Sequence, residues 1–165
     1  MQARREHLLI EPQKCTGCRR CMIACAMQHF DKPDPRLSRV KILTLNPQGL
    51  SVPIICMACE QAPCIKVCPM NARFRLKNGC VGTNTDVCIG CRACVYICPV
   101  GSPTVHPSSG QTMTCDMCWE AKEEPWCVTA CRLEGALRLG TDWSKARTAA
   151  RRRANQIRTA LPARQ

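Results

Sequence analysis

Cysteine dominates the chemistry that this sequence can perform. The chain has 165 residues, and sixteen of its 17 cysteines fall into four groups of four. The groups are Cys15, Cys18, Cys21 and Cys25 (group I); Cys56, Cys59, Cys64 and Cys68 (group II); Cys88, Cys91, Cys94 and Cys98 (group III); and Cys115, Cys118, Cys127 and Cys131 (group IV). Four thiolates complete the ligand set of one tetrahedral metal ion or one iron–sulfur cube. The internal repeat therefore predicts four metal centres.

The spacing inside the groups indicates the kind of metal centre. Groups I and III have the C-x2-C-x2-C-x3-C spacing that binds [4Fe–4S] clusters in bacterial ferredoxins, and Pro99 adds the Cys-Pro ending to group III. Groups II and IV widen the gap before the third cysteine to four and eight residues but keep the final C-x3-C. We therefore expect all sixteen cysteines to be iron ligands in four [4Fe–4S] clusters. The histidines are not needed as ligands, and we interpret them as surface or loop residues: His7, His29 and His106.

Zinc is the rival metal, because C-x2-C pairs also form four-cysteine zinc sites. Zinc ribbons pair two such knuckles across a longer gap and do not need further cysteines at these spacings. A disulfide framework is disfavoured, because the cysteine count is odd and no apolar leader separates Arg4 and Arg5 from Cys15. A cytoplasmic location is therefore expected. The alternative hypothesis is a cysteine-rich zinc protein that binds nucleic acid through a basic tail.

The rest of the composition excludes several other classes. Apolar residues reach 45% only when cysteine is counted, and six residues are aromatic. A core this poor in large side chains needs another source of stability, which four inorganic clusters would supply. No run approaches the ~18 apolar residues of a membrane-spanning helix, so no membrane span is expected. The sequence has no Ser-His-Asp set, phosphate loop or paired-acid site, so we predict no catalytic residues and no enzyme activity on this chain.

The segments between the groups predict an α+β fold with little regular structure. Residues 39–45 alternate as in a strand, and an Asn-Gly pair within residues 74–82 predicts a hairpin with a type I′ turn. Short helices are expected after the fourth cysteine of each group, and residues 99–110 read as a return loop. The seventeenth cysteine, Cys80, is interpreted as a small buried residue of the hairpin and not as a ligand.

The last segment, residues 141–165, differs in kind. It has no cysteine, seven Lys or Arg residues and one acid. Apolar side chains recur at three- and four-residue steps: Trp143, Ala146, Ala150, Ala154, Ile157 and Leu161. We expect a basic amphipathic C-terminal helix that serves docking or self-association, because a lone helix with a narrow stripe gains little stability unless it packs on something.

Clusters would change the charge of the chain. A formal net charge of +12 would ordinarily suggest a nucleic-acid partner. Sixteen thiolates and four oxidised cluster cores together lower that charge to about +4, with about −2 on residues 1–140 and +6 on the tail. The basic excess then lies in the tail, where no aromatic stacking platform accompanies it. No nucleic-acid partner is therefore expected.

Two stretches resemble a known family. CMACEQAPCIKVCPMNA in group II and CIGCRACVYICPVGSP in group III are similar to the motifs of four-cluster, ferredoxin-type electron-transfer subunits, the dimethyl sulfoxide reductase iron–sulfur subunit family. The short chain also resembles the electron-transfer subunit of bacterial tungsten aldehyde oxidoreductases. The resemblance implies a polyferredoxin that relays electrons between a catalytic subunit, a tungsten or molybdenum pterin enzyme, and a flavin subunit, ferredoxin or quinone.

The resemblance also implies that the groups exchange their fourth cysteines. One cube would take Cys15, Cys18, Cys21 and Cys131; its neighbour would take Cys115, Cys118, Cys127 and Cys25; the inner pair would take Cys56, Cys59, Cys64 and Cys98, and Cys88, Cys91, Cys94 and Cys68. Two nested ferredoxin-like lobes follow from this layout. Residues 1–50 with 111–140 would form the outer lobe, and residues 51–110 the inner lobe.

Overall fold

The computed structural model describes residues 7–45, 49–119, 124–132, 136–141 and 155. The elements are β1 (His7–Ile10), η1 (Pro12–Lys14), α1 (Arg20–Phe30), η2 (Pro35–Leu37), β2 (Lys41–Leu45), β3 (Leu50–Ile54), α2 (Pro63–Lys66), β4 (Arg73–Arg75), β5 (Val81–Thr83), α3 (Ala93–Ile97), β6 (Thr104–Val105), β7 (Thr112–Met113), α4 (Trp126–Thr129) and β8 (Leu137–Gly140). The expected C-terminal helix lies outside the described residues. The α+β class with little regular structure is confirmed for the rest.

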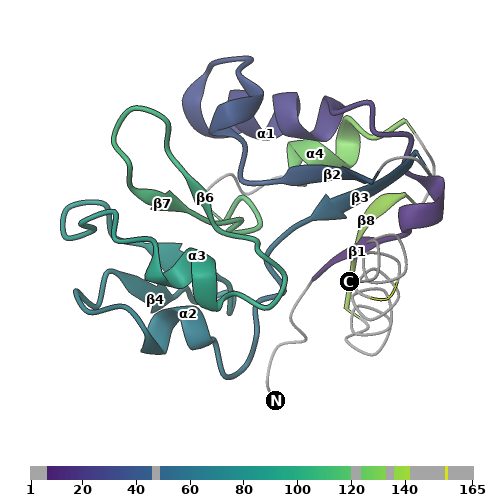
Figure 1. The fold of residues 1–165 in the computed structure, drawn as a ribbon. Helices are drawn as coiled ribbons and strands as arrows, with labels where there is room; N and C mark the ends of the chain where they lie inside the picture. Colours follow the sequence, from purple (N-terminus) through teal and green to yellow (C-terminus); the bar gives the residue numbers. More distant parts are fainter. Residues whose placement is uncertain (1–6, 46–48, 120–123, 133–135, 142–154, 156–165) are drawn as a thin grey trace, which may run out of the picture.

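In the described part of the chain, four two-stranded antiparallel sheets take the place of one continuous sheet (Figure 1). Three are hairpins of consecutive strands, β2–β3, β4–β5 and β6–β7. The fourth joins β1 to β8, with His7 opposite Gly140 and Ile10 opposite Leu137. The first and last described strands therefore pair with each other. This pairing holds the segment before group I beside the segment after group IV.

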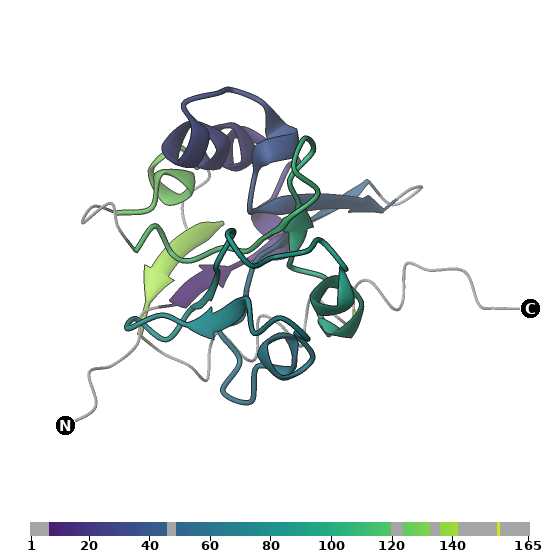
Figure 2. The ribbon, with the colours of Figure 1, turned by 90° about the vertical axis from the view of Figure 1, so that its left-hand side faces the viewer.

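The helices form two pairs. Helix α1 packs against α4, and α2 packs against α3. The two pairs lie at opposite sides of the molecule in Figure 1 and remain separated in the orthogonal view of Figure 2. Group I, which enters α1, therefore lies beside group IV, and group II lies beside group III.

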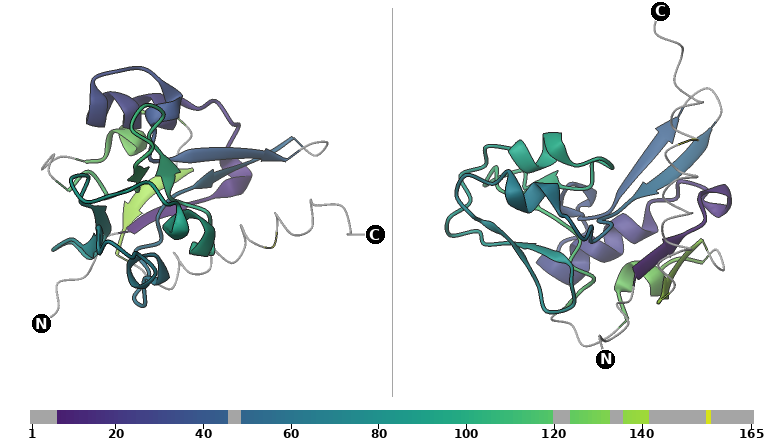
Figure 3. Two further views of the ribbon diagram at one scale, coloured as in Figure 1. Left: turned by 60° about the vertical axis from the view of Figure 1, so that its left-hand side comes forward. Right: turned by 90° about the horizontal axis from the view of Figure 1, so that it is seen from below.

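Two hairpins connect these parts. The β2–β3 hairpin projects from the body of the molecule in both views of Figure 3. It pairs Thr44 with Ser51, and the β6–β7 hairpin pairs Val105 with Thr112. The lobe limits expected at 50/51 and 110/111 each fall inside one of these hairpins.

In the described residues no helix starts directly after Cys68 or Cys98, so the prediction is wrong for groups II and III, and in group I the helix starts before Cys25 and continues past it. Each helix contains the third cysteine of its group, and α1 also contains the fourth: Cys21 and Cys25 in α1, Cys64 in α2, Cys94 in α3 and Cys127 in α4. The C-x3-C spacing is the i, i+4 spacing of a helical turn. One helical turn therefore separates the third thiol of a group from the fourth along the chain.

The predicted hairpin of residues 74–82 is present, but its turn is not type I′. That turn needs positive φ at both central residues, and of the Asn-Gly pair only Gly79 has it, at 84°. Gly79 N–H donates to the Leu76 carbonyl, and Leu76 N–H donates to the Cys80 carbonyl. This is a three-residue loop closed by a glycine in the left-handed region. The Asn78 side chain instead accepts a hydrogen bond from Cys80 N–H.

The apolar core is as thin as the composition indicates. The largest apolar side chains that are fully buried are aliphatic, among them Ile55, Val40 and Val52. Cysteines fill much of the interior: Cys25, Cys115 and Cys127 pack with Leu8, Ile10 and Leu137. Among the described residues no helix is long and apolar enough to cross a membrane.

Candidate metal centres

The sixteen grouped cysteines gather in four sets, and each set has three members of one group and one of another. In site I, the pKa of Cys21 is raised to about 12 by burial and then by repulsion from the neighbouring thiols of Cys15, Cys18 and Cys131. Cys15 likewise has a raised pKa, through burial and through Cys18 and Cys131 among its neighbours. Site I is therefore Cys15, Cys18, Cys21 and Cys131.

Site IV mirrors this exchange. Cys115 and Cys127 are buried. Burial, followed by repulsion from Cys127 and Cys25, raises the pKa of Cys115, and burial, followed by repulsion from Cys25 and Cys118, raises the pKa of Cys127. Burial also raises the pKa of Cys118 to about 11, with Asp116 and Cys25 adding to the rise. Site IV is therefore Cys115, Cys118, Cys127 and Cys25.

The other two sets each line a small cavity. Site II is Cys56, Cys59, Cys64 and Cys98, which share one cavity with Arg73 and Thr114. Site III is Cys68, Cys88, Cys91 and Cys94, which share another with Arg73 and Thr112. In each set the fourth member comes from the partner group.

The four sites form a row. Cys21 of site I and Cys56 of site II both pack against the buried cluster that contains Cys25, Cys115 and Cys127 of site IV. Site IV therefore lies beside site I and beside site II. Arg73 lines both inner cavities and so joins sites II and III. The order is I, IV, II, III.

The thiols receive backbone hydrogen bonds suited to ligands. Backbone N–H groups lie 3.3 Å from the sulfurs of Cys25, Cys68 and Cys98, donated by residues 39, 72 and 102. Such bonds stabilise thiolates and are a means by which a protein sets the potential of an iron–sulfur cluster. Burial is the main cause of the raised pKa of seven of the thiols, which would keep these seven protonated at neutral pH: Cys15, Cys21, Cys56, Cys59, Cys115, Cys118 and Cys127. The positive charge of a bound iron–sulfur core offsets the repulsion between the thiolates, because all four thiolates bind that core.

Arg73 provides the sharpest test of whether the sites suit iron–sulfur clusters. Its side chain is 3% exposed, and its Nη1 donates to Thr83 Oγ1 at 2.8 Å and to Thr114 Oγ1 at 2.6 Å. Nε and Nη2 are buried without a hydrogen-bond partner among the described residues. A buried cation with unused donors is costly unless an anion is near. An oxidised cube with four thiolates carries about −2, so clusters in sites II and III fit this guanidinium.

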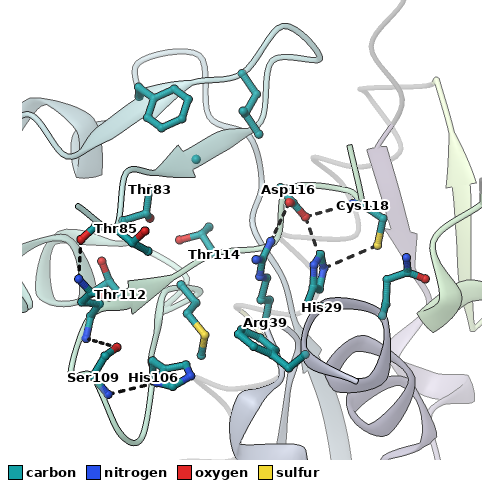
Figure 4. A pocket seen from close by; sticks show the side chains of 17 residues that line it. His29, Arg39, Thr83, Thr85, His106, Ser109, Thr112, Thr114, Asp116 and Cys118 are labelled. Atoms are coloured by element: carbon teal, nitrogen blue, oxygen red, sulfur yellow. Dashed lines mark hydrogen bonds and ion pairs between the residues drawn. The ribbon is translucent and has the colours of Figure 1, made fainter. Parts of the chain in front are cut away.

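Three polar side chains, those of His29, Arg39 and Asp116, lie in contact with one another beside Cys118 of site IV (Figure 4). His29 Nε2 lies 3.8 Å from Cys118 Sγ and 3.6 Å from Asp116 Oδ1. Arg39 Nη1 lies 2.6 Å from Asp116 Oδ2, and these side chains line an open cleft of about 490 Å³. Burial, and then the Arg39 charge, lower the pKa of His29 to about 4 although Asp116 opposes them.

The interpretation of His29 as a surface or loop residue is therefore wrong. It lies on α1, four residues after Cys25, so the helix presents both side chains to the same side. That spacing is the signal in the sequence that could have found it. His106 is a loop residue, as expected: its Nδ1 accepts from the backbone of Ser108 and Ser109. His29, Asp116 and Cys118 have the composition of a metal site, but Cys118 belongs to site IV.

The seventeenth cysteine is buried, as expected. Cys80 is 3% exposed and lines a small cavity with Cys56 and Met117. Trp119 and Trp126, which flank the long group IV loop, are partly exposed.

Comparisons with known proteins identify the kind of cluster. Two family profiles, each described as a 4Fe-4S dicluster domain, match residues 14–72 and 48–141. The polyferredoxin-like subunit of aliphatic sulfonate oxidoreductase from Pyrococcus furiosus is 38% identical over 137 residues, covering 81% of this chain and 77% of the relative. The B subunit of anaerobic dimethyl sulfoxide reductase from Escherichia coli is 32% identical, covering 75% and 68%.

A third relative and a solved structure agree with these two. The thiosulfate reductase electron transfer subunit PhsB from Salmonella typhi is 33% identical, covering 81% and 74%. The benzoyl coenzyme A reductase complex BamBC with benzoyl-CoA contains a polypeptide that is 25% identical, with a TM-score of 0.50 and coverage of 82% and 78%. The matches to dicluster domains replace the zinc and nucleic-acid hypothesis with four [4Fe–4S] clusters.

Proposed function

The chain belongs to the 4Fe-4S dicluster family of ferredoxin-type electron-transfer subunits, and from that membership we propose that it connects the catalytic subunit of its oxidoreductase complex to a separate electron carrier. It carries four [4Fe–4S] clusters and performs no substrate chemistry itself. Each cluster supplies a one-electron couple when bound. The protein holds the clusters in place, excludes water and adjusts their potentials.

The ligand assignment is part of the proposal. Each of sites I to IV holds one cluster, with three cysteines from the group of that number and one from its partner group; Cys80 is not a ligand. The observation that carries the function is the single row I, IV, II, III, because it lets an electron enter at one end and leave at the other. Sites I and IV belong to an outer lobe and sites II and III to an inner lobe.

This chain's own residues perform identifiable tasks in that row. Arg73 holds a buried positive charge between sites II and III. Backbone N–H groups donate to Cys25, Cys68 and Cys98 and favour their thiolate forms. His29 Nε2 and the backbone N–H of Arg39 lie beside sulfurs of site IV. Positive charge and donated hydrogen bonds favour the electron-rich state of a cluster.

The catalytic partner is proposed to be a tungsten or molybdenum pterin enzyme of the aldehyde oxidoreductase type, and the carrier to be a flavin subunit, a ferredoxin or a quinone. Support comes from the group II and III motifs and from the relatives, which are named as subunits of sulfonate, dimethyl sulfoxide and thiosulfate enzymes. Self-association through residues 141–165, nearly all of which lie outside the described residues, is proposed as well. Deleting that segment should lower the particle mass of the native complex.

Anaerobic purification of the native complex tests the function. We expect about sixteen iron and sixteen acid-labile sulfides per chain, together with a catalytic subunit that contains tungsten or molybdenum. The purified complex should reduce an artificial acceptor with electrons from the catalytic subunit, and removal of this chain should abolish that transfer. Stoichiometric zinc without sulfide, or catalysis by this chain alone, would contradict the proposal.

A further inference from the structure

The two ends of the row reach the surface. All 17 cysteines are described, and of these only Cys18 in site I and Cys91 in site III are exposed. Each belongs to an end site of the row, and the intervening sites are more enclosed. An electron that enters or leaves the protein therefore passes most directly through these two surfaces. The side chains around the two exposed thiols differ in charge and polarity.

The surface around Cys18 is strongly basic. Four cations lie within two residues of a site I cysteine, and all four are exposed: Lys14, Arg19, Arg20 and Arg132. No acidic residue lies within two residues of those cysteines. Four positive charges exceed the charge of about −2 that an oxidised cluster brings to the site. This surface, the basic end, therefore keeps a positive field even with its cluster in place.

The surface around Cys91 carries little charge when residues are counted in the same way, and it is rich in apolar side chains. Within two residues of a site III cysteine, two cations and one acid leave a net charge of +1: Lys66, Arg92 and Asp86. Exposed apolar side chains surround them instead: Val67, Met70, Val87, Ile89 and Tyr96. Ile89 is 64% exposed and Tyr96 83% exposed. We call this surface the apolar end.

We propose that the basic end docks an electron-carrier protein with an acidic face around its own redox centre, while the apolar end contacts the catalytic subunit. The inference rests on the proposed function, since it assigns the two partners of the row to its two ends. Permanent subunit interfaces are the more apolar ones, whereas transient redox encounters are small and depend on electrostatic steering. The four cations come from two chain segments and flank an exposed thiol, which suits a broad protein face.

A charge-reversal experiment on the cluster-loaded protein tests the proposal. The probe is an acidic two-cluster bacterial ferredoxin in its reduced form, mixed with the oxidised protein in a stopped-flow instrument. Arg19→Glu/Arg20→Glu should lower the second-order rate at low ionic strength by about tenfold or more, because steering contributes factors of that size. It should also flatten the dependence of the rate on salt.

Lys66→Glu/Arg92→Glu is the matched control, since it reverses the same number of charges at the apolar end. Its loss of rate at low ionic strength should be clearly smaller, and at about 0.1 M its rate should lie within about twofold of the wild type, because screening at that ionic strength limits the reach of exposed charges to about 10 Å. Equal losses in both variants, or no loss in either, would overturn the proposal. Dithionite reduction and iron content of each variant establish that the clusters are intact. Failure of the wild type to take up electrons from dithionite would instead overturn the proposed function.

Cross-linking gives a second measurement that does not depend on altered charge. A carbodiimide joins a lysine to a carboxylate in contact with it, and the described exposed lysines near the end sites are Lys14 and Lys66. With the same ferredoxin, cross-links should form at Lys14 and not at Lys66. In the native complex, Lys66 should be the lysine that loses its reactivity towards acetylating reagents. The reverse pattern would assign the ends oppositely and contradict the proposal.

Discussion

Arg73 Nη1 donates a 2.6 Å hydrogen bond to Thr114 Oγ1, and this bond holds a buried guanidinium where the cavities of sites II and III meet. The charge is almost completely shielded from water. Its effect on the two neighbouring clusters is therefore weakly screened. From this position Arg73 can affect the reduction potentials of two of the four clusters, those in sites II and III.

Replacement of Arg73 should lower the reduction potentials of the clusters in sites II and III. Arg73→Gln removes a positive charge that favours the reduced state, and a unit charge at this range corresponds to a shift on the order of 50–100 mV. A redox titration followed by EPR measures the shift. Arg36→Gln, which removes an exposed arginine paired with Asp34, should leave the potentials unchanged. An Arg73→Gln protein with wild-type potentials would show that Arg73 is only structural.

His29 should raise the potential of the cluster in site IV. Its Nε2 lies 3.8 Å from Cys118 Sγ, and hydrogen bonds to ligand sulfurs favour reduction. His29→Leu should lower that potential by about 40 mV, the equivalent of a hydrogen bond of about 1 kcal/mol. His29→Gln keeps an N–H donor and should recover part of the difference. Equal potentials in both variants and the wild type would rule out the contact as a determinant.

Gly17 should be required for the site I loop. It has φ of +73°, and a Cβ there would collide with Ser51 Oγ. Gly17→Ala should therefore leave about twelve of the sixteen iron atoms bound, through loss of one cluster. Gly49→Ala is the matched control, because Gly49 has a similar φ of +64° but nothing near its Cβ position. It should retain all its iron, and a loss as large as that of Gly17→Ala would contradict the steric explanation.

The exchange of fourth cysteines makes an unusual prediction for Cys98. This residue belongs to group III by sequence but lies in site II with Cys56. The EPR spectrum of Cys98→Ala should therefore show the same altered cluster as Cys56→Ala, because both lose a ligand of site II. Cys88→Ala should alter a different signal. If Cys98→Ala instead matched Cys88→Ala, each group would bind its own cluster.

The sequence predicts the type of cluster well, because the spacing of the cysteines within each group is that of [4Fe–4S] ligands. Which fourth cysteine joins each set does not follow from local spacing and is expected only from the family resemblance. Pro99 and the C-x3-C endings can be read directly from the sequence, and the small number of large apolar residues predicts the thin core. Two long-range contacts lie beyond such reasoning, although the spacing of His29 from Cys25 marks the residue itself. Arg73 and Thr114 are 41 residues apart, and His29 and Cys118 are 89 apart. Only folding shows that these side chains meet.

The local errors have local causes. The Asn-Gly pair does mark a turn, but an extra loop residue lets Gly79 alone take the positive φ. Cysteine-rich stretches lack an amphipathic pattern, so the sequence gives no sign of helices within the motifs and favours helices after them. The helices instead begin inside the motifs, where the C-x3-C spacing equals a helical turn.

The measurement that tests the central claim most directly is an anomalous difference map at the iron edge, from anaerobically grown crystals of the cluster-loaded protein. We predict four iron–sulfur cubes in the order of sites I, IV, II and III, each bound by three cysteines of one group and one of its partner group. Fewer than four cubes, a branched arrangement, or any cube bound by the four cysteines of a single group would contradict the account.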